Sequence, residues 1–145
     1  MRDFILTGEG IVEPAWIDEN DHMNMMWYTH LVDLATQALL DRAQEQSSED
    51  VATFVAARVT MSHRRELRLG NSWQIWSGFS DVSEKFFLIA HKITCGKAIV
   101  ARCDMTIVPF SHQARTAQLF SRSMVDRALR FVIPGLAQDN KIINR

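Results

Sequence analysis

The densest group of polar side chains in this 145-residue sequence lies directly before a long apolar segment. It runs Asp18-Glu19-Asn20-Asp21-His22-Met23-Asn24, and the apolar segment starts at Met25. The first amides of a helix are unpaired and carry partial positive charge, so they can hold a carbonyl oxygen that gains negative charge. Asp18, a few residues upstream, could attack that carbonyl carbon or activate a water, with His22 and Asn24 donating hydrogen bonds. A thioester suits either route, because its thiolate is a good leaving group.

The same residues also have a purely structural interpretation. Asp18, Asn20 and Asn24 are typical of turns and helix caps, and His22 could be an ordinary surface histidine. The elements around the loop must therefore decide whether the polar groups converge.

The apolar pattern predicts two helices and five strands. Residues 25–40 repeat at helical spacing on more than one stripe, which indicates a helix buried on most sides, with Asn24 as N-cap and a polar loop over 41–50. Strands are expected at 10–13, 54–62, 73–79, 87–93 and 99–107, with turns at 80–83 and 94–97. The spacing of Phe120, Met124, Ala128 and Val132 predicts a short helix that ends near Pro134.

These elements predict a helix followed by a four-stranded meander. The meander needs one face covered, and the 25–40 helix is the only large element available, so we expect the sheet to wrap around it. The other face and the sheet edges would then need a partner subunit.

The segment from Glu13 to Tyr28 resembles the D-x-N-x-H-x-N-x-x-x-Y signature of hotdog-fold acyl thioesterases of the 4-hydroxybenzoyl-CoA thioesterase-like group. The 62–71 segment is similar to the part of that family that precedes its third strand, and the resemblance spans about residues 10–115. It implies an α+β hotdog fold over a single domain, 1–145. That fold is an antiparallel five-stranded sheet wrapped around a central helix, here with a short C-terminal helix.

The resemblance also implies a set of site residues. Asp18 takes the place of the catalytic nucleophile or base, and the amide of Met25 takes the place of the group that polarises the thioester carbonyl. Asn20, His22 and Asn24 match the remaining motif positions, and a related plant branch gives catalytic roles to its Asn and His positions. Which residue does the main work stays open.

One position departs from the family pattern. Asp21 stands where most bacterial relatives have Gly directly before the His. If its carboxylate points into the site, it should raise the pKa of Asp18 and favour a base over a nucleophile.

Arg64 and Arg65 belong to the strongest basic group, and a CoA substrate brings three phosphoryl groups. We expect these two arginines to contact the phosphoryl groups. The alternative is a solvated strand end, partly neutralised by Glu66.

Charge and composition exclude several other function classes. Sixteen Lys and Arg against seventeen Asp and Glu give a net charge of −1, which argues against nucleic-acid or membrane partners. No dinucleotide, P-loop or serine-hydrolase motif occurs and no zinc-ligand spacing, so no cofactor and no metal are expected. Two cysteines favour a reducing compartment, and we expect a cytoplasmic protein.

The sequence therefore predicts an acyl-CoA thioesterase that forms a homodimer or a dimer-of-dimers tetramer. Two alternatives remain open: a hotdog hydratase or dehydratase acting on acyl thioesters, and a non-catalytic acyl-CoA binding module.

Overall fold

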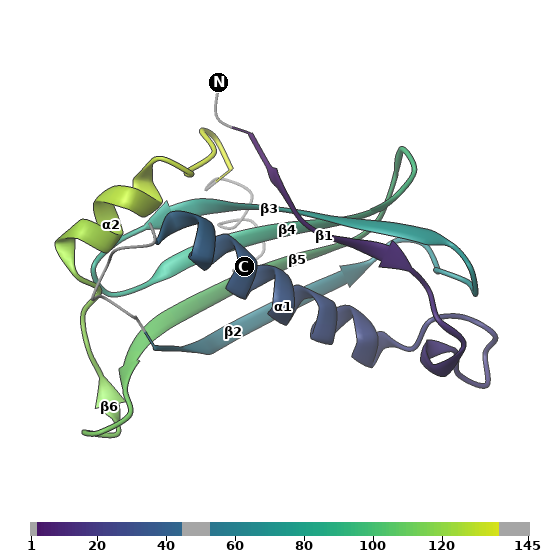
Figure 1. Cartoon of the computed structure of the whole chain (residues 1–145), viewed down its shortest axis with the longest axis horizontal. Helices are drawn as coiled ribbons and strands as arrows, with labels where there is room; N and C mark the ends of the chain where they lie inside the picture. Colours follow the sequence, from purple (N-terminus) through teal and green to yellow (C-terminus); the bar gives the residue numbers. More distant parts are fainter. Residues whose placement is uncertain (1–2, 45–52, 137–145) are drawn as a thin grey trace.

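The computed structural model describes residues 3–44 and 53–136 (Figure 1). The elements, in chain order, are β1 (Ile5–Ile11), a 3-10 turn (Pro14–Trp16), α1 (Met25–Ala43), β2 (Phe54–His63), β3 (Ser72–Val82), β4 (Phe87–Cys95), β5 (Ala98–Ser111), β6 (Thr116–Ala117) and α2 (Arg122–Leu129). The long strands form one twisted sheet, and α1 runs along one of its faces (Figure 1). This is the predicted α+β hotdog architecture.

The strands pair antiparallel in the order β1-β3-β4-β5-β2, and the short β6 pairs with β5. The predicted β3-β4-β5 succession is confirmed, with Gly96-Lys97 as the turn between Cys95 and Ala98. The predicted four-stranded meander is wrong for β2, which lies beside β5 instead of β3. Residues 64–71 carry the chain across three strand spacings, about 14 Å, to β3. A connection of that length does not force its two strands to be neighbours.

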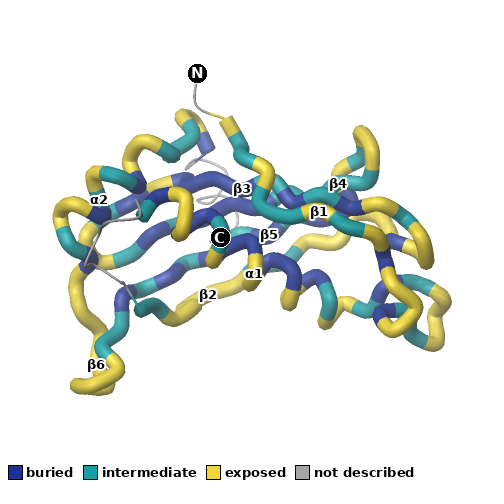
Figure 2. The backbone as a smooth tube through the Cα atoms, in the orientation of Figure 1, coloured by how far each residue is buried: buried dark blue, intermediate teal, exposed yellow. Residues whose placement is uncertain are grey.

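Helix α1 buries one face against the sheet. Its buried side chains are Tyr28, Leu31, Val32, Ala35, Thr36, Leu39, Leu40 and Ala43. The prediction of a helix buried on most sides is wrong for the single chain, since Met25, Met26 and Leu34 are 55–68% exposed. Figure 2 shows the same alternation of buried and exposed residues along the tube of α1. The helix also continues to Ala43, past the predicted end at residue 40, because Asp41 and Arg42 are tolerated on its solvent side.

The alternating pattern of β4 and β5 forms the centre of the core. Phe87, Ile89, His91 and Ile93 on β4 are fully buried, and so are Ala101, Cys103 and Ile107 on β5, while Met105 is nearly so. Ile99 was predicted on the same face but is 37% exposed. The register shifts between Ile93 and Thr94, so this end of the hairpin turns away from the core.

Several predicted boundaries need correction. The first strand covers Ile5–Ile11 rather than 10–13, because β1 pairs with β3 from Ser77 back to Ser72. Residues 80–82, predicted as a turn, continue β3 past a register shift at Phe79 to Asp81. Helix α2 ends at Leu129, and Val132 bridges to Phe79 beyond it. The predicted loop 41–50 falls partly in α1, and 45–50 lie outside the described residues.

A chain of hydrogen bonds crosses the core between the helix and three strands. Thr7 on β1 lies 2.6 Å from Ser77 on β3, whose hydroxyl lies 2.6 Å from Nδ1 of His91 on β4. Nε2 of His91 lies 2.9 Å from the hydroxyl of Thr36 on α1, which donates to the carbonyl of Val32. This polar chain fixes the position of α1 on the sheet, because hydrogen bonds are directional and the surrounding apolar contacts are not.

Candidate active site

The loop 18–24 is closed on itself and fixed to its surroundings by backbone hydrogen bonds. The amide of Asp18 donates to His22 O at 3.1 Å, and the amide of Asp21 donates to Asp18 O at 3.0 Å. Met23 N–H donates to Leu67 O at 2.7 Å and Asn24 N–H to Trp16 O at 2.9 Å. The loop is therefore held in place at the start of α1 by both the preceding chain and the β2–β3 connection.

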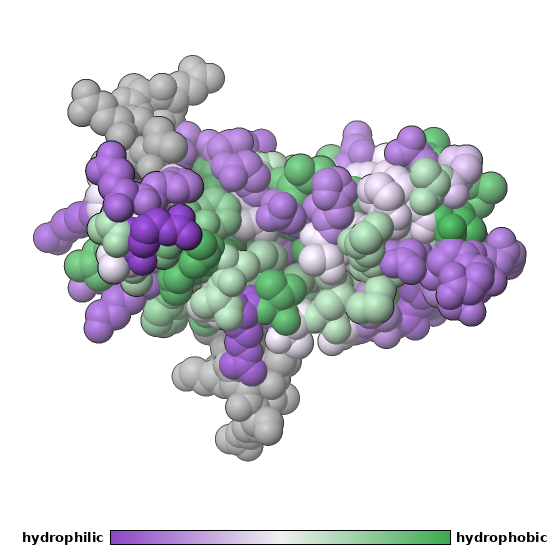
Figure 3. Space-filling model, turned by 90° about the horizontal axis from the view of Figure 1, so that it is seen from below, coloured by the Kyte–Doolittle hydropathy of each residue, from purple (hydrophilic) through white to green (hydrophobic). Residues whose placement is uncertain are grey.

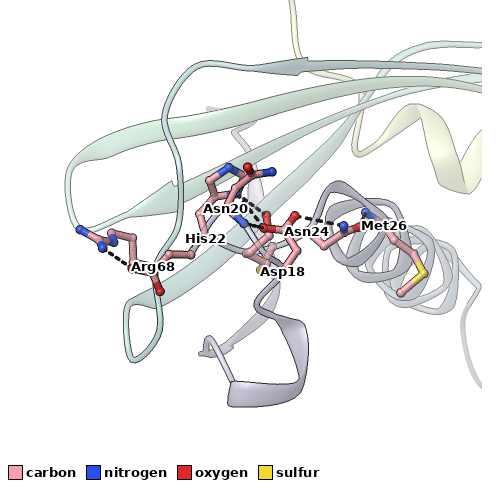
Figure 4. A network of polar contacts seen from close by, with 8 residues as sticks. Asp18, Asn20, His22, Asn24, Met26 and Arg68 are labelled. Atoms are coloured by element: carbon pink, nitrogen blue, oxygen red, sulfur yellow. Dashed lines mark hydrogen bonds and ion pairs between the residues drawn. The ribbon is translucent and has the colours of Figure 1, made fainter.

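The Asp18 carboxylate lies inside this loop, with its side chain only 12% exposed. Its Oδ1 accepts the amide of Asn20 at 2.9 Å, and its Oδ2 accepts the side-chain amide of Asn24 at 3.1 Å. Figure 4 shows Asn20 and Asn24 converging on Asp18 next to the first turn of α1. Two donors thus orient a largely buried carboxylate beside a helix start, as the acyl-transfer hypothesis requires.

Asn24 joins the carboxylate to the helix. Its Oδ1 accepts Met26 N–H at 2.9 Å, which confirms the predicted N-cap, and its backbone carbonyl accepts Trp27 N–H at 3.0 Å. Among the described residues, no hydrogen-bond acceptor is shown for Met25 N–H. This is the amide that the sequence resemblance selected for polarising a carbonyl, and the first amides of a helix have no acceptor within the helix.

His22 lies between the carboxylate and the open side of the loop. Its Nδ1 is 3.2 Å from Met23 O and 4.0 Å from Asp18 Oδ1, and its side chain is 34% exposed. A proton on Nδ1 would be donated to the Met23 carbonyl, which leaves Nε2 as an acceptor. In that tautomer the ring can hold a water or a substrate N–H.

Asp21 points away from Asp18. Its carboxylate pairs with Arg68 at 2.7 Å, and its side chain is 77% exposed. Figure 4 shows Arg68 set apart from Asp18 and Asn24. The hypothesis that Asp21 adds a second negative charge to the site is therefore wrong. Its backbone explains the usual Gly, since φ is 61°, a left-handed value that Asp tolerates better than most residues.

A cavity of about 330 Å³ opens beside the loop and the helix start. It is lined by His22, Met23, Met25, Tyr28, His63, Arg64, Arg65 and Glu66. The structure thus brings the predicted Arg64 and Arg65 to the same space as His22 and Met25. Asp18 does not line this cavity in the single chain and approaches it through His22.

The cavity is lined by four side chains that the sequence did not assign to the site: Met23, Tyr28, His63 and Glu66. Tyr28 packs edge-on against His63, with ring centroids 4.8 Å apart, and Glu66 lines the cavity three residues after His63. Burial raises the pKa of the Tyr28 phenol above its usual value, against the opposing effect of a hydrogen bond with the Leu67 backbone. Tyr28 is the last residue of the matched motif, and this position could have indicated that it belongs to the site. His63 and Glu66 reach the cavity because β2 pairs with β5 at the sheet edge, which the sequence does not indicate.

The tryptophans and cysteines lie away from this cavity. Trp16 stacks on Trp27 at 5.0 Å and contacts Trp73 at 6.2 Å, so three of the four tryptophans pack on one another. Burial raises the pKa of the Cys103 thiol to about 12, which fits a packing role in the core rather than a reactive thiol. Within residues 3–44 and 53–136, no group of three metal-ligating side chains occurs. No helix in that part of the chain is long and apolar enough to cross a membrane.

The sequence was compared with models of known protein families. Residues 12–129 match the thioesterase-like superfamily, a stretch that contains the loop, the helix and the cavity. The chain belongs to this superfamily. The match confirms the predicted relationship to hotdog-fold thioesterases and the prediction of a thioesterase-type enzyme. No curated protein matches the sequence.

Solved structures share the fold of this chain at low sequence identity. A hypothetical protein from Staphylococcus aureus in complex with CoA is 14% identical, with TM-score 0.78 over 94% of this chain and 92% of that one. A thioesterase from Thermus thermophilus complexed with coenzyme A and Zn is 17% identical, with TM-score 0.76 over 87% and 98%. A hexameric broad-specificity acyl-coenzyme A thioesterase is 12% identical, with TM-score 0.71 over 94% and 99%.

Proposed function

We propose that this superfamily member hydrolyses an acyl-CoA thioester to a free acid and CoA. The observation that carries the proposal is the Asp18–Asn24–Met25 arrangement. A carboxylate that is 12% exposed is tied by Asn24 to the helix start, one residue from an unpaired amide. This arrangement supports Asp18 as the base and Met25 N–H as the oxyanion donor.

In the general-base route, Asp18 takes a proton from a water held by His22. The hydroxide adds to the carbonyl carbon, and the negative charge that develops on oxygen is stabilised by Met25 N–H and the helix dipole. The carbon–sulfur bond then breaks, and the thiolate leaves and takes up a proton. In the nucleophilic route Asp18 attacks the carbon itself, the carbon–sulfur bond breaks and the thiolate leaves as a mixed anhydride forms. Water then hydrolyses the anhydride, which releases the free acid and regenerates the Asp18 carboxylate.

Asn20 and Asn24 are positioning residues in both routes. They hold the two oxygens of Asp18 at 2.9 and 3.1 Å, so the carboxylate is oriented before substrate arrives. Arg64 and Arg65, which line the cavity, bind an anionic group of the substrate. Two of the structures with this fold contain CoA, which supports a CoA-type ligand.

We propose that two copies assemble through β2, as a homodimer or a dimer of dimers. Directly paired residues share a face of the sheet, so Val59 points to the same side as its buried partner Met105. Yet Val59 is 45% exposed, which means that the chain's own helix leaves the inner face at β2 uncovered. Seen from below, this side carries apolar and neutral residues across its middle (Figure 3). A hexameric relative shows that larger assemblies occur on this fold.

The free thiols Cys95 and Cys103 support the cytoplasm as the proposed compartment, since unpaired cysteines suit reducing conditions. A non-catalytic binding module would be favoured by a second acidic side chain in the site, and Asp21, which pairs with Arg68 on the exposed side of the loop, does not supply one.

Release of free thiol from a panel of acyl-CoA thioesters tests the proposal. A thioesterase liberates one thiol per acid formed. A hydratase changes the acyl chain and leaves CoA attached, and a binding module releases nothing. Thiol release well above the uncatalysed rate is the expected result; its absence over the whole panel would contradict the proposal.

A further inference from the structure

Tyr28 places a buried polar group on the wall of the cavity beside the helix start. The residue is only 3% exposed, and yet it lines this cavity together with His22 and Met25. A buried hydroxyl without hydrogen-bond partners is unfavourable, so each buried phenol is expected to have an acceptor as well as a donor. The partners of this phenol therefore indicate what the cavity can hold.

The phenol oxygen of Tyr28 has a donor from the protein, whereas its proton has no acceptor shown. A hydrogen bond with the Leu67 backbone lowers the pKa of Tyr28, against the larger effect of burial. A hydrogen bond lowers the pKa of a phenol only if it stabilises the phenolate, so Leu67 N–H donates and the oxygen accepts. Because burial outweighs this bond, the phenol keeps its proton at neutral pH. In residues 3–44 and 53–136, no acceptor is shown for that proton.

The hydroxyl of Tyr28 lies toward the same end of α1 as the amide of Met25. Helical side chains lean toward the N-terminus and residues three apart share a face, so Tyr28 extends back over the turn that begins with Met25. Its partner Leu67 is at this end too, since Leu67 O accepts Met23 N–H at 2.7 Å, two residues before the helix. The phenol and the Met25 amide thus border one cavity at the helix start.

We propose that Tyr28 is a second oxyanion donor, whose hydroxyl binds the thioester carbonyl oxygen together with Met25 N–H. The inference rests on the proposed hydrolase function and adds a catalytic residue to it. When water or Asp18 adds to the carbonyl carbon, an electron pair of the C=O bond moves onto oxygen, and the phenol donates a hydrogen bond to it. This bond strengthens as the charge develops, so it stabilises the transition state more than the bound substrate. The carbonyl re-forms as the carbon–sulfur bond breaks, and Tyr28 has kept its proton throughout.

The sequence contains a single tyrosine, so its hydroxyl can be altered in two independent ways. Tyr28→Phe removes the hydroxyl and keeps the ring that packs against His63. Expression with 3-fluorotyrosine changes residue 28 alone and keeps a hydroxyl that donates more strongly, since fluorine lowers the pKa of a phenol. Thr7→Val is the control, because it removes a hydroxyl from the polar chain of the core that does not line the cavity.

The kinetics are measured with a thioester from the panel that the native protein hydrolyses. We expect Tyr28→Phe to lower kcat about 100-fold, the effect of losing one oxyanion donor, and to change KM by less than about threefold. The 3-fluorotyrosine protein should have at least about half the native kcat, and Thr7→Val should stay within about twofold. Thermal unfolding confirms that each protein is folded at the assay temperature.

Three results would overturn the inference. If Tyr28→Phe keeps the native kcat and KM, the hydroxyl does not touch the reacting atoms. If it raises KM and leaves kcat unchanged, the hydroxyl binds a part of the substrate that does not react. A comparable loss of kcat in the 3-fluorotyrosine protein or in Thr7→Val would show that packing, and not the donor, was disturbed. Thiol release by the native protein from none of the thioesters would instead overturn the proposed hydrolase function itself.

Discussion

At the scale of single residues, the environment of Asp18 decides the chemistry. The motif could predict the groups that hold the Asp18 carboxylate, because the Asn20 backbone amide and the Asn24 side-chain amide are close to it in sequence and the helix start orders them locally. The composition of the cavity was not predictable in the same way. His63 and Glu66 reach Tyr28 only because β2 lies at the sheet edge beside β5, a long-range pairing that no local pattern specifies.

The conformation of Asp21 gives a test of its role. Asp21→Gly keeps a backbone that accepts φ of 61° and removes only the exposed ion pair with Arg68. We expect the free energy of unfolding to change by less than about 1 kcal/mol and kcat/KM by less than about threefold. Asp21→Ala loses the same pair but disfavours the left-handed backbone, so it should cost about 1–2 kcal/mol more. Chemical denaturation and steady-state kinetics measure both; a tenfold loss of activity in the Gly variant would place Asp21 in the site.

At the scale of elements, the buried His91 links helix and sheet and carries a pH dependence. Burial lowers the pKa of His91 from 6.5 to about 3. Between these values the unfolded chain binds one more proton than the folded chain, so stability falls as pH falls below 6.5.

The corresponding measurement is the free energy of unfolding between pH 7 and pH 5. His91 should contribute a loss of about 1.4 kcal/mol per pH unit at the lower end of this range, and His91→Gln should lack that slope although it is less stable at pH 7. The exposed histidines are shared by both proteins and cancel in the comparison. Equal slopes for the two proteins would show that His91 titrates normally in the folded state.

Two glycines of β1 test how closely this strand packs on β3. A Cβ at Gly10 would lie 2.7 Å from Cζ2 of Trp73, whereas one at Gly8 would lie 3.4 Å from Cζ3 of the same ring. Gly10→Ala should therefore lower the free energy of unfolding by about 1–3 kcal/mol, because the indole is held by Trp16 and cannot move freely. Gly8→Ala should cost less than about 1 kcal/mol. Thermal and urea unfolding compare them, and equal costs would contradict the close approach.

The elements also show where sequence patterns stop being informative. The alternation in β4 and β5 predicted their buried faces almost completely, since a period of two fixes which side chains share a face. The bulge that turns Ile99 outwards and the position of β2 depend on pairing with residues far along the chain. Helix α1 was expected to be covered on most sides because Met25, Met26 and Leu34 are apolar, and the single chain leaves them exposed.

At the scale of the whole molecule, the exposed apolar residues of β2 and α1 indicate a surface that another subunit covers. A lysine at Val59 would place a charge on the inner face that the second copy covers, at a cost of several kcal/mol to association. We expect Val59→Lys to have the native mass of a monomer at concentrations where the unchanged protein is oligomeric. Leu129→Lys on α2, at nearly the same exposure of 44% against 45%, should keep the oligomer. Light scattering would contradict the β2 interface if both variants retain the unchanged mass.

The most direct test of the proposed mechanism is the rate of thioester hydrolysis by Asp18→Asn. The substitution keeps the size of the side chain but removes the charge that acts as base or nucleophile, and it leaves one oxygen in place of the two that accept from Asn20 and Asn24. Glu19→Gln, on the exposed neighbouring residue, is the control. With a thioester that the unchanged protein hydrolyses, we expect kcat to fall more than about 100-fold for Asp18→Asn and to stay within about twofold for the control. Hydrolysis by Asp18→Asn as fast as by the unchanged protein would contradict the central role of this carboxylate.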